Sequence, residues 1–142
     1  MDHRGPGTRT KARKRALDIL FEADLRDEPV AEVLADRVAL ASPPVRRFTI
    51  ELVEGVAAHR AEVDAAIAGC LREGWTLERM PRVDRSLARI AAYELLHTDT
   101  EPTIAIDEAV SLAAELSTDD SPGFLNGVLG ALSLQRQENP AS

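Results

Sequence analysis

Apolar residues recur every three or four positions along almost the whole chain, and this spacing constrains the fold more than any other feature. It is clearest between residues 83 and 96, where Val83, Leu87, Ile90 and Leu95 fall on one face of a helix. No segment alternates polar and apolar residues at the period of two that a half-buried strand requires. The sequence therefore predicts an all-α fold of about six or seven helices.

Prolines, glycines and polar runs divide this pattern into segments. The predicted helices cover residues 9–25, 30–40, 45–71, 83–96, 102–116 and 122–134, with a short turn at 76–81. The 45–71 segment is too long for one ordinary helix, and Gly55 together with His59-Arg60 leaves room for a bend. We expect a single helical domain over residues 9–135, between a flexible tail of residues 1–8 and a frayed tail of residues 136–142.

Positive charge is concentrated at the N-terminus of an otherwise acidic chain. The formal net charge is −7, yet Arg4, Arg9, Lys11, Arg13, Lys14 and Arg15 all lie within the first 15 residues. Terminal blocks of basic residues often bind nucleic acid, whereas a solvated tail is the plainer alternative. From this stretch alone the two interpretations carry similar weight.

The basic block continues directly into an amphipathic helix. At 100° per residue, Lys11, Lys14 and Arg15 share one arc of roughly 100°, opposite the apolar side formed by Leu17 and Leu20. Arg13 projects on the apolar side, where we expect it to snorkel at the edge. The basic arc would therefore be held on a packed helix, which loses less ordering entropy on binding than a free tail does.

The sequence lacks the motifs of an enzyme or of a metal protein. His3, His59 and His97 are isolated, and no cysteines stand at metal-ligand spacing, so we expect no metal and no cofactor. The single cysteine, Cys70, fits a reducing cytoplasm. The N-terminus is not followed by an uncharged apolar run, so we expect a cytoplasmic protein without a signal peptide or a membrane span.

Several segments resemble the NusB family of bacterial transcription antitermination factors. The segment 11–21 is similar to the basic, alanine-containing start of the family's first helix. A more specific match runs through Tyr93-Glu94-Leu95, residues 102–113 and residues 124–129, in the family's order and spacing. The resemblance spans nearly the whole chain and implies two packed three-helix subdomains.

The resemblance also implies a function. It implies binding of boxA RNA, in the leader of ribosomal RNA operons, together with the ribosomal protein NusE. The pair would then act in the antitermination complex of RNA polymerase, without catalysis. Matched position by position, the expected RNA-contacting residues are Arg9, Lys11, Arg13, Lys14, Arg15, Phe21, Asp120, Phe124 and Asn126.

These residues have different expected roles. The cations would contact phosphates, and Phe124 would either stack on an unpaired base or pack between helices. Phe21 is as well explained by the core as by RNA, and we expect Gly127 to allow close helix packing. For a basic partner such as NusE, the candidate acids are Glu78, Asp84 and Glu94, although for any one of them an exposed, solubilising acid is the favoured explanation.

The sequence departs from the family pattern at two positions. Gly123 and Ala114 replace residues that are basic in many members, which leaves the N-terminal cations dominant.

A similar helical module begins the rRNA cytosine methyltransferases, but these require a further α/β domain, which we do not expect in a chain of this length. A helical scaffold or a homodimer that covers the basic helix also stays open.

Overall fold

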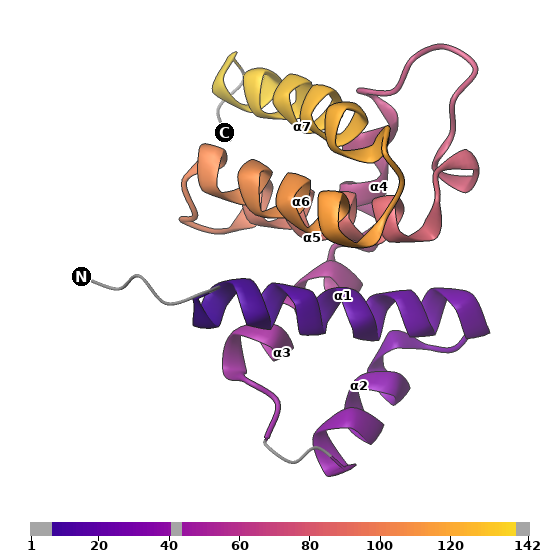
Figure 1. Cartoon of the computed structure of the whole chain (residues 1–142), viewed down its shortest axis with the longest axis vertical. Coiled ribbons are helices and arrows are strands. Elements are labelled where there is room, and N and C mark those ends of the chain that lie inside the picture. Colours follow the sequence, from indigo (N-terminus) through magenta and orange to yellow (C-terminus); the bar gives the residue numbers. More distant parts are fainter. Residues whose placement is uncertain (1–6, 41–43, 139–142) are drawn as a thin grey trace.

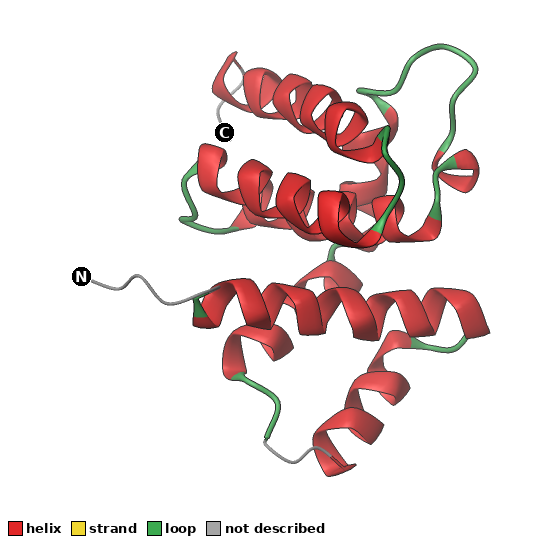
Figure 2. Cartoon of the chain, viewed as in Figure 1, coloured by secondary structure: helices red, strands yellow, loops and turns green. Residues whose placement is uncertain are grey.

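The computed structural model describes residues 7–40 and 44–138, and every regular element within them is helical (Figures 1 and 2). The predicted all-α class is confirmed. The elements are α1 (Thr8–Arg26), α2 (Val30–Leu40), α3 (Arg47–Ala58), α4 (Arg60–Ala68), a 3₁₀ turn η1 (Leu77–Arg79), α5 (Arg82–His97), α6 (Pro102–Leu116) and α7 (Ser121–Glu138).

The helices form two groups that meet along α1 and α5. In Figure 1, α1, α2 and α3 make the lower group, and α5, α6 and α7 with α4 make the upper one. Helix α5 packs against α1, α3, α4, α6 and α7, so it is the central element of the molecule. This arrangement matches the expected pair of three-helix subdomains, with α4 as an additional short helix.

The sequence of α5 explains its central position. Leu87, Ile90 and Leu95 are buried, as the predicted apolar stripe requires. Ala88, Ala91 and Ala92 are buried as well, and such small side chains let neighbouring helices approach from several sides. Most of the helix is therefore inside the core, which leaves its polar residues in need of internal partners.

The predicted bend in residues 45–71 is confirmed, because α3 ends at Ala58 and α4 begins at Arg60. His59 stands between them with a backbone φ of −112°. Just before the bend, Gly55 lies against the ring of Tyr93 from α5. A Cβ atom at Gly55 would lie 2.1 Å from Cζ of that ring, so only glycine allows this approach.

The ends of the chain differ slightly from the prediction. Helix α1 already begins at Thr8, and α7 continues to Glu138 rather than fraying from residue 136. Residues 1–6, including Arg4 and His3, and residues 139–142 of the two expected tails lie outside the described residues. In the described part of the chain, no helix is both long and apolar enough to cross a membrane.

Candidate nucleic-acid interface

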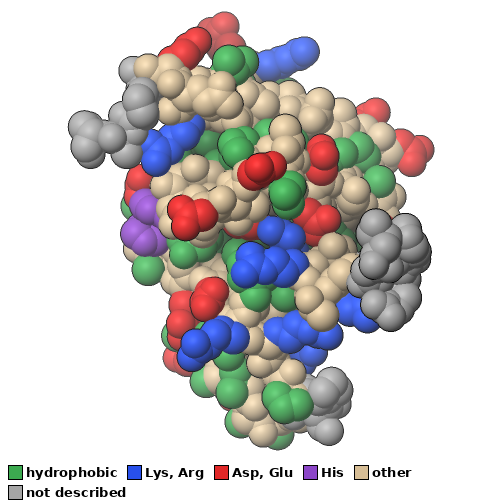
Figure 3. Space-filling model, turned by 90° about the vertical axis from the view of Figure 1, so that its left-hand side faces the viewer, with side chains coloured by type: hydrophobic (Ala, Val, Ile, Leu, Met, Phe, Trp, Pro, Cys, Tyr) green, Lys and Arg blue, Asp and Glu red, His purple; other side chains and the backbone are tan. Residues whose placement is uncertain are grey.

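Accessible cations gather along the first half of α1, where Lys11 and Lys14 are exposed and Arg15 is half-buried. Lys11, Lys14 and Arg15 line one shallow groove of about 340 Å³, together with Arg46 from the segment that leads into α3. The same groove contains the apolar side chains of Leu17 and Leu116 and one acid, Asp18. Figure 3, which faces the N-terminal end of α1, shows several Lys and Arg side chains in the middle and lower part of that face, with Asp and Glu side chains around them. We call Lys11, Lys14, Arg15 and Arg46 the basic groove.

One cation of the basic groove already has a partner. Lys14 Nζ lies 2.5 Å from Glu115 Oε2 at the end of α6, and both side chains are about half exposed. An ion pair this exposed is weak and is screened by salt, so a phosphate can replace Glu115 at little cost.

Arg9, in the first turn of α1, is also exposed, but it lines a separate hollow that contains Asp99, Glu101 and Glu108. Its guanidinium carbon lies 4.1 Å from the ring centroid of Phe48 in α3, within the range of a cation–π contact. Neither Phe48 nor Arg46 stood among the predicted site residues. The signal for both was the pair Arg46-Arg47 immediately before an aromatic residue, which repeats the basic character of α1 on a second helix.

Arg13 differs from the other cations, and the expectation that it snorkels at the edge and contacts phosphate is wrong for this fold. Only 4% of Arg13 is exposed. Its Nε and Nη2 atoms donate to the two carboxylate oxygens of Glu94 at 2.9 and 2.7 Å, and Nη1 donates to Glu108 at 3.2 Å. This is a bidentate pair between α1 and α5, so Arg13 has no guanidinium edge left for RNA.

The electrostatics agree with this internal role. Burial by itself lowers the pKa of the Arg13 guanidinium, but the hydrogen bonds and charges of Glu94 and Glu108 outweigh burial and raise that pKa above its ordinary value. Thr10 also donates a hydrogen bond to Glu108, at 2.8 Å. The start of α1 is thus fixed to both α5 and α6 through carboxylates.

Two of the three candidate acids for a basic partner are also buried, and this part of the prediction is wrong. Glu94 is 0% exposed, because it is the partner of Arg13. Asp84 is 2% exposed and accepts hydrogen bonds from Ser117 at 2.6 Å and Ser121 at 2.8 Å, which joins the start of α5 to the corner between α6 and α7. Glu78 in η1 is exposed and remains a candidate.

The sequence held a signal for the buried pair. Glu94 follows Ile90 by four residues and Leu87 by seven, so it falls on the apolar stripe of its own helix. Arg13 falls on the apolar side of α1. An acid and a base on two inward-facing stripes indicate an internal ion pair, although periodicity alone does not say which residues meet.

The aromatic residues of the predicted site lie elsewhere. Phe124 is half-buried near the start of α7, with its ring centroid 6.0 Å from that of the exposed Trp75. Helix α7 packs on α5 and α6, away from α1 (Figure 1), so the structure does not place Phe124 in the basic groove. Phe21 is half-buried on α1 itself.

The other predicted residues of α7 and of the corner before it are accessible. Asp120 and Asn126 are both exposed. A Cβ atom at Gly127 would meet nothing within 4 Å, so the expectation that this glycine allows close helix packing is wrong. The exposed Trp75 and the half-buried Phe124 make a second candidate surface, which shares no residue with the basic groove.

The sequence of the chain is similar to those of known proteins. The model of the NusB family matches residues 10–133. A "Transcription antitermination protein NusB" of Cutibacterium acnes is 56% identical over 92% of this chain, which spans half of that relative's length. A protein of the same name from Salinispora arenicola is 57% identical over 87% of this chain and 93% of its own length.

A solved structure agrees with the sequence comparison. The structure described as "Antitermination Factors NusB and NusE in complex with dsRNA" has a TM-score of 0.78 and 26% identity, and it covers 89% of this chain and 96% of its own. The relatives are named as antitermination factors, a class without enzymatic activity, in agreement with the expectation of a non-enzymatic protein. By sequence and by fold, the chain belongs to the NusB family.

Proposed function

We propose that this antitermination factor binds boxA-type RNA of ribosomal RNA operon leaders through the basic groove and Arg9, and that it does so together with NusE. The observation that carries the proposal is the concentration of accessible cations in the basic groove of a chain whose net charge is −7. The similar solved complex, which contains NusE and double-stranded RNA, supports both partners. Action within the RNA polymerase antitermination complex, supporting rRNA transcription, follows as the biological role.

The number of accessible cations sets the expected salt dependence of RNA binding. Binding of single-stranded RNA weakens with salt at a logarithmic slope of about −0.7 for each phosphate contact. Arg9, Lys11, Lys14 and Arg15 are the predicted cations that the structure leaves accessible, so about four contacts give a slope near −3. The acidic remainder of the chain repels RNA, which keeps the affinity of the chain alone modest.

The same acidity favours a basic second protein. A ribosomal protein that covers acidic surface removes repulsion and adds its own phosphate contacts, so RNA binding should be tighter in its presence. Glu78 is one exposed acid available for such a contact, whereas Glu94 and Asp84 are used inside the fold.

Fluorescence anisotropy with labelled boxA RNA tests the proposal. The proteins compared are the wild type and the triple variant Lys11→Ala/Lys14→Ala/Arg15→Ala, each with and without NusE, and a shuffled RNA of equal length serves as the RNA control. A second triple variant, Arg72→Ala/Arg79→Ala/Arg136→Ala, removes the same charge from other parts of the chain. We expect boxA RNA to bind more tightly than shuffled RNA, NusE to strengthen binding, and only the first triple variant to lose it.

The outcomes separate the alternatives. Equal weakening by both triple variants would mean that overall charge, rather than the basic groove, governs binding. No RNA binding by the wild type even with NusE would overturn the proposal and favour the scaffold or homodimer. A Phe124→Leu variant tests base stacking on the second surface, where loss of one stacked base costs about 1–3 kcal/mol.

A further inference from the structure

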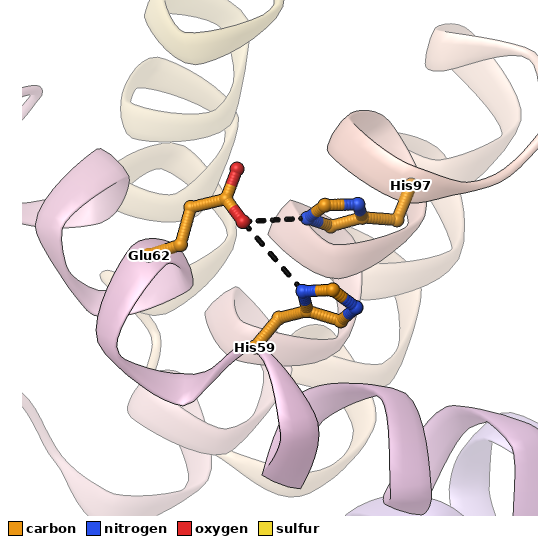
Figure 4. Close-up of side chains that lie close together, drawn as sticks. All are labelled: His59, Glu62 and His97. Atoms are coloured by element: carbon orange, nitrogen blue, oxygen red, sulfur yellow. Dashed lines mark hydrogen bonds and ion pairs between the residues drawn. The ribbon is translucent and has the colours of Figure 1, made fainter.

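Two histidines that are isolated in the sequence meet in the fold beside a glutamate (Figure 4). His59 stands at the junction of α3 and α4, Glu62 lies in the first turn of α4, and His97 is the last residue of α5. Glu62 Oε1 lies 2.9 Å from His97 Nε2 and 3.6 Å from His59 Nδ1. One carboxylate oxygen therefore faces two ring nitrogens that come from different elements.

The distances between the ligand atoms are close to those of a metal site. In a tetrahedral zinc site with bonds of about 2.0–2.1 Å, two nitrogen or oxygen ligands lie roughly 3.3 Å apart. The two oxygen–nitrogen distances here bracket that value, and all three ligand atoms lie within 4.8 Å of one another. Because the lone pairs of stacked rings lie in the ring planes, one imidazole must turn out of the stack for both nitrogens to face the same ion.

Aromatic contacts bring the two rings together at this point of the fold. The imidazoles of His59 and His97 are stacked, with centroids 3.9 Å apart and an interplanar angle of 23°. Tyr93, one turn before His97, stacks against both, with centroid distances of 5.9 and 5.8 Å. Tyr93 is itself packed on Gly55, so the rings rest on a support that belongs to the core.

The three side chains also offer the ligand types of a transition-metal site. Two imidazole nitrogens with one carboxylate are a donor set that zinc and its neighbours among the divalent transition ions prefer. Magnesium and calcium prefer sites made of oxygen ligands only.

We propose that His59, Glu62 and His97 bind a divalent transition ion of the zinc class, with water completing the coordination. The ion would connect the α3–α4 junction to the end of α5, and so fix the bend at which the chain passes from the lower group of helices to the upper one. Its role would be structural or regulatory, and it is independent of the RNA-binding proposal.

Zinc titration of the full chain without a purification tag tests the proposal. Binding is followed by isothermal titration calorimetry and by the thermal midpoint, and the ligand field is followed by visible absorption after Co²⁺ is added. At zinc concentrations of about 100 times the Kd, the midpoint should rise by roughly 5–10 °C. Mg²⁺ at the same concentration should leave the midpoint unchanged, and Co²⁺ should give the intense visible bands of a tetrahedral site.

Matched variants locate the ion. His59→Asn, His97→Asn and Glu62→Gln should each lose the shift, whereas His3→Asn and Glu51→Gln remove the same groups elsewhere and should retain it. Far-ultraviolet circular dichroism without metal shows that each variant is folded, and Glu62 is exposed enough for its variant to fold if the histidine variants do not. Retention of the zinc shift in Glu62→Gln and in the folded histidine variants, or its loss in His3→Asn, would overturn the proposal.

Discussion

Arg13 and Lys14 are neighbours in the sequence, but they belong to two different regions of the molecule. Arg13 points inwards, is 4% exposed and forms a bidentate pair with Glu94, whereas Lys14 points into the basic groove and meets only the half-exposed Glu115. One side of α1 thus joins the two groups of helices, and the other side is available for a partner. Two neighbouring cations of one helix therefore have different roles, because one faces a buried carboxylate and the other faces solvent.

The two ion pairs differ in energy because one is buried and the other is exposed to solvent. Removing one member of a buried ion pair leaves an uncompensated charge in the core and costs about 3–5 kcal/mol. An exposed pair contributes about 0–1 kcal/mol, because water and salt screen it. The following predictions use this difference, from the largest expected effect to the smallest.

Arg13→Ala should lower the free energy of unfolding by about 3–5 kcal/mol, because Glu94 stays buried without its partner. Urea denaturation followed by circular dichroism measures this effect. The double replacement Arg13→Met/Glu94→Leu removes both charges, and we expect it to recover most of the loss. A wild-type free energy of unfolding in Arg13→Ala would show that the pair is not buried in solution.

Thr49→Val tests a neutral contact on the same inward side of α1. The Thr49 hydroxyl is buried and donates a hydrogen bond of 2.9 Å to the carbonyl of Ala12. Valine keeps the shape and removes the donor, so unfolding should become easier by about 1 kcal/mol in the same urea experiment. An effect as large as that of Arg13→Ala would mean that packing, and not charge, dominates this side.

Lys14→Ala should change the free energy of unfolding by less than about 0.5 kcal/mol, because the Lys14–Glu115 pair is exposed. The same denaturation assay measures it, with Arg72→Ala as the control for loss of one surface charge. A loss above about 2 kcal/mol would contradict the division of α1 into two sides.

Glu22, further along α1, gives the smallest effect, and it depends on pH. A hydrogen bond from Arg37 in α2, with the charges of Arg37 and Arg26, lowers the pKa of the Glu22 carboxyl. Its contribution to stability is therefore complete above the carboxyl's ordinary pKa and is lost as the pH falls through the lowered value. The difference in thermal midpoint between the wild type and Glu22→Gln should be constant near neutral pH and disappear in acid.

Helical periodicity predicted much of this structure because it reports which side of each helix is buried. It placed Arg13 on the apolar side of α1 and the bend near His59, and the structure bears out both. It did not identify Glu94 as the partner of Arg13, since such pairs form between residues 81 positions apart and depend on how α1 lies on α5. For the same reason, the spacing of residues within one helix could not predict that His59 stacks on His97.

The salt dependence of RNA binding tests the two-sided description of α1 most directly. The folded Arg13→Met/Glu94→Leu variant, which leaves the net charge unchanged, is compared with Lys11→Ala/Lys14→Ala/Arg15→Ala, which removes three positive charges from the basic groove. We predict a wild-type slope for the first variant and a slope reduced by about 2 for the second. A reduced slope in the first variant with a wild-type slope in the second would contradict the account, because it would make Arg13 the phosphate contact and the basic groove irrelevant.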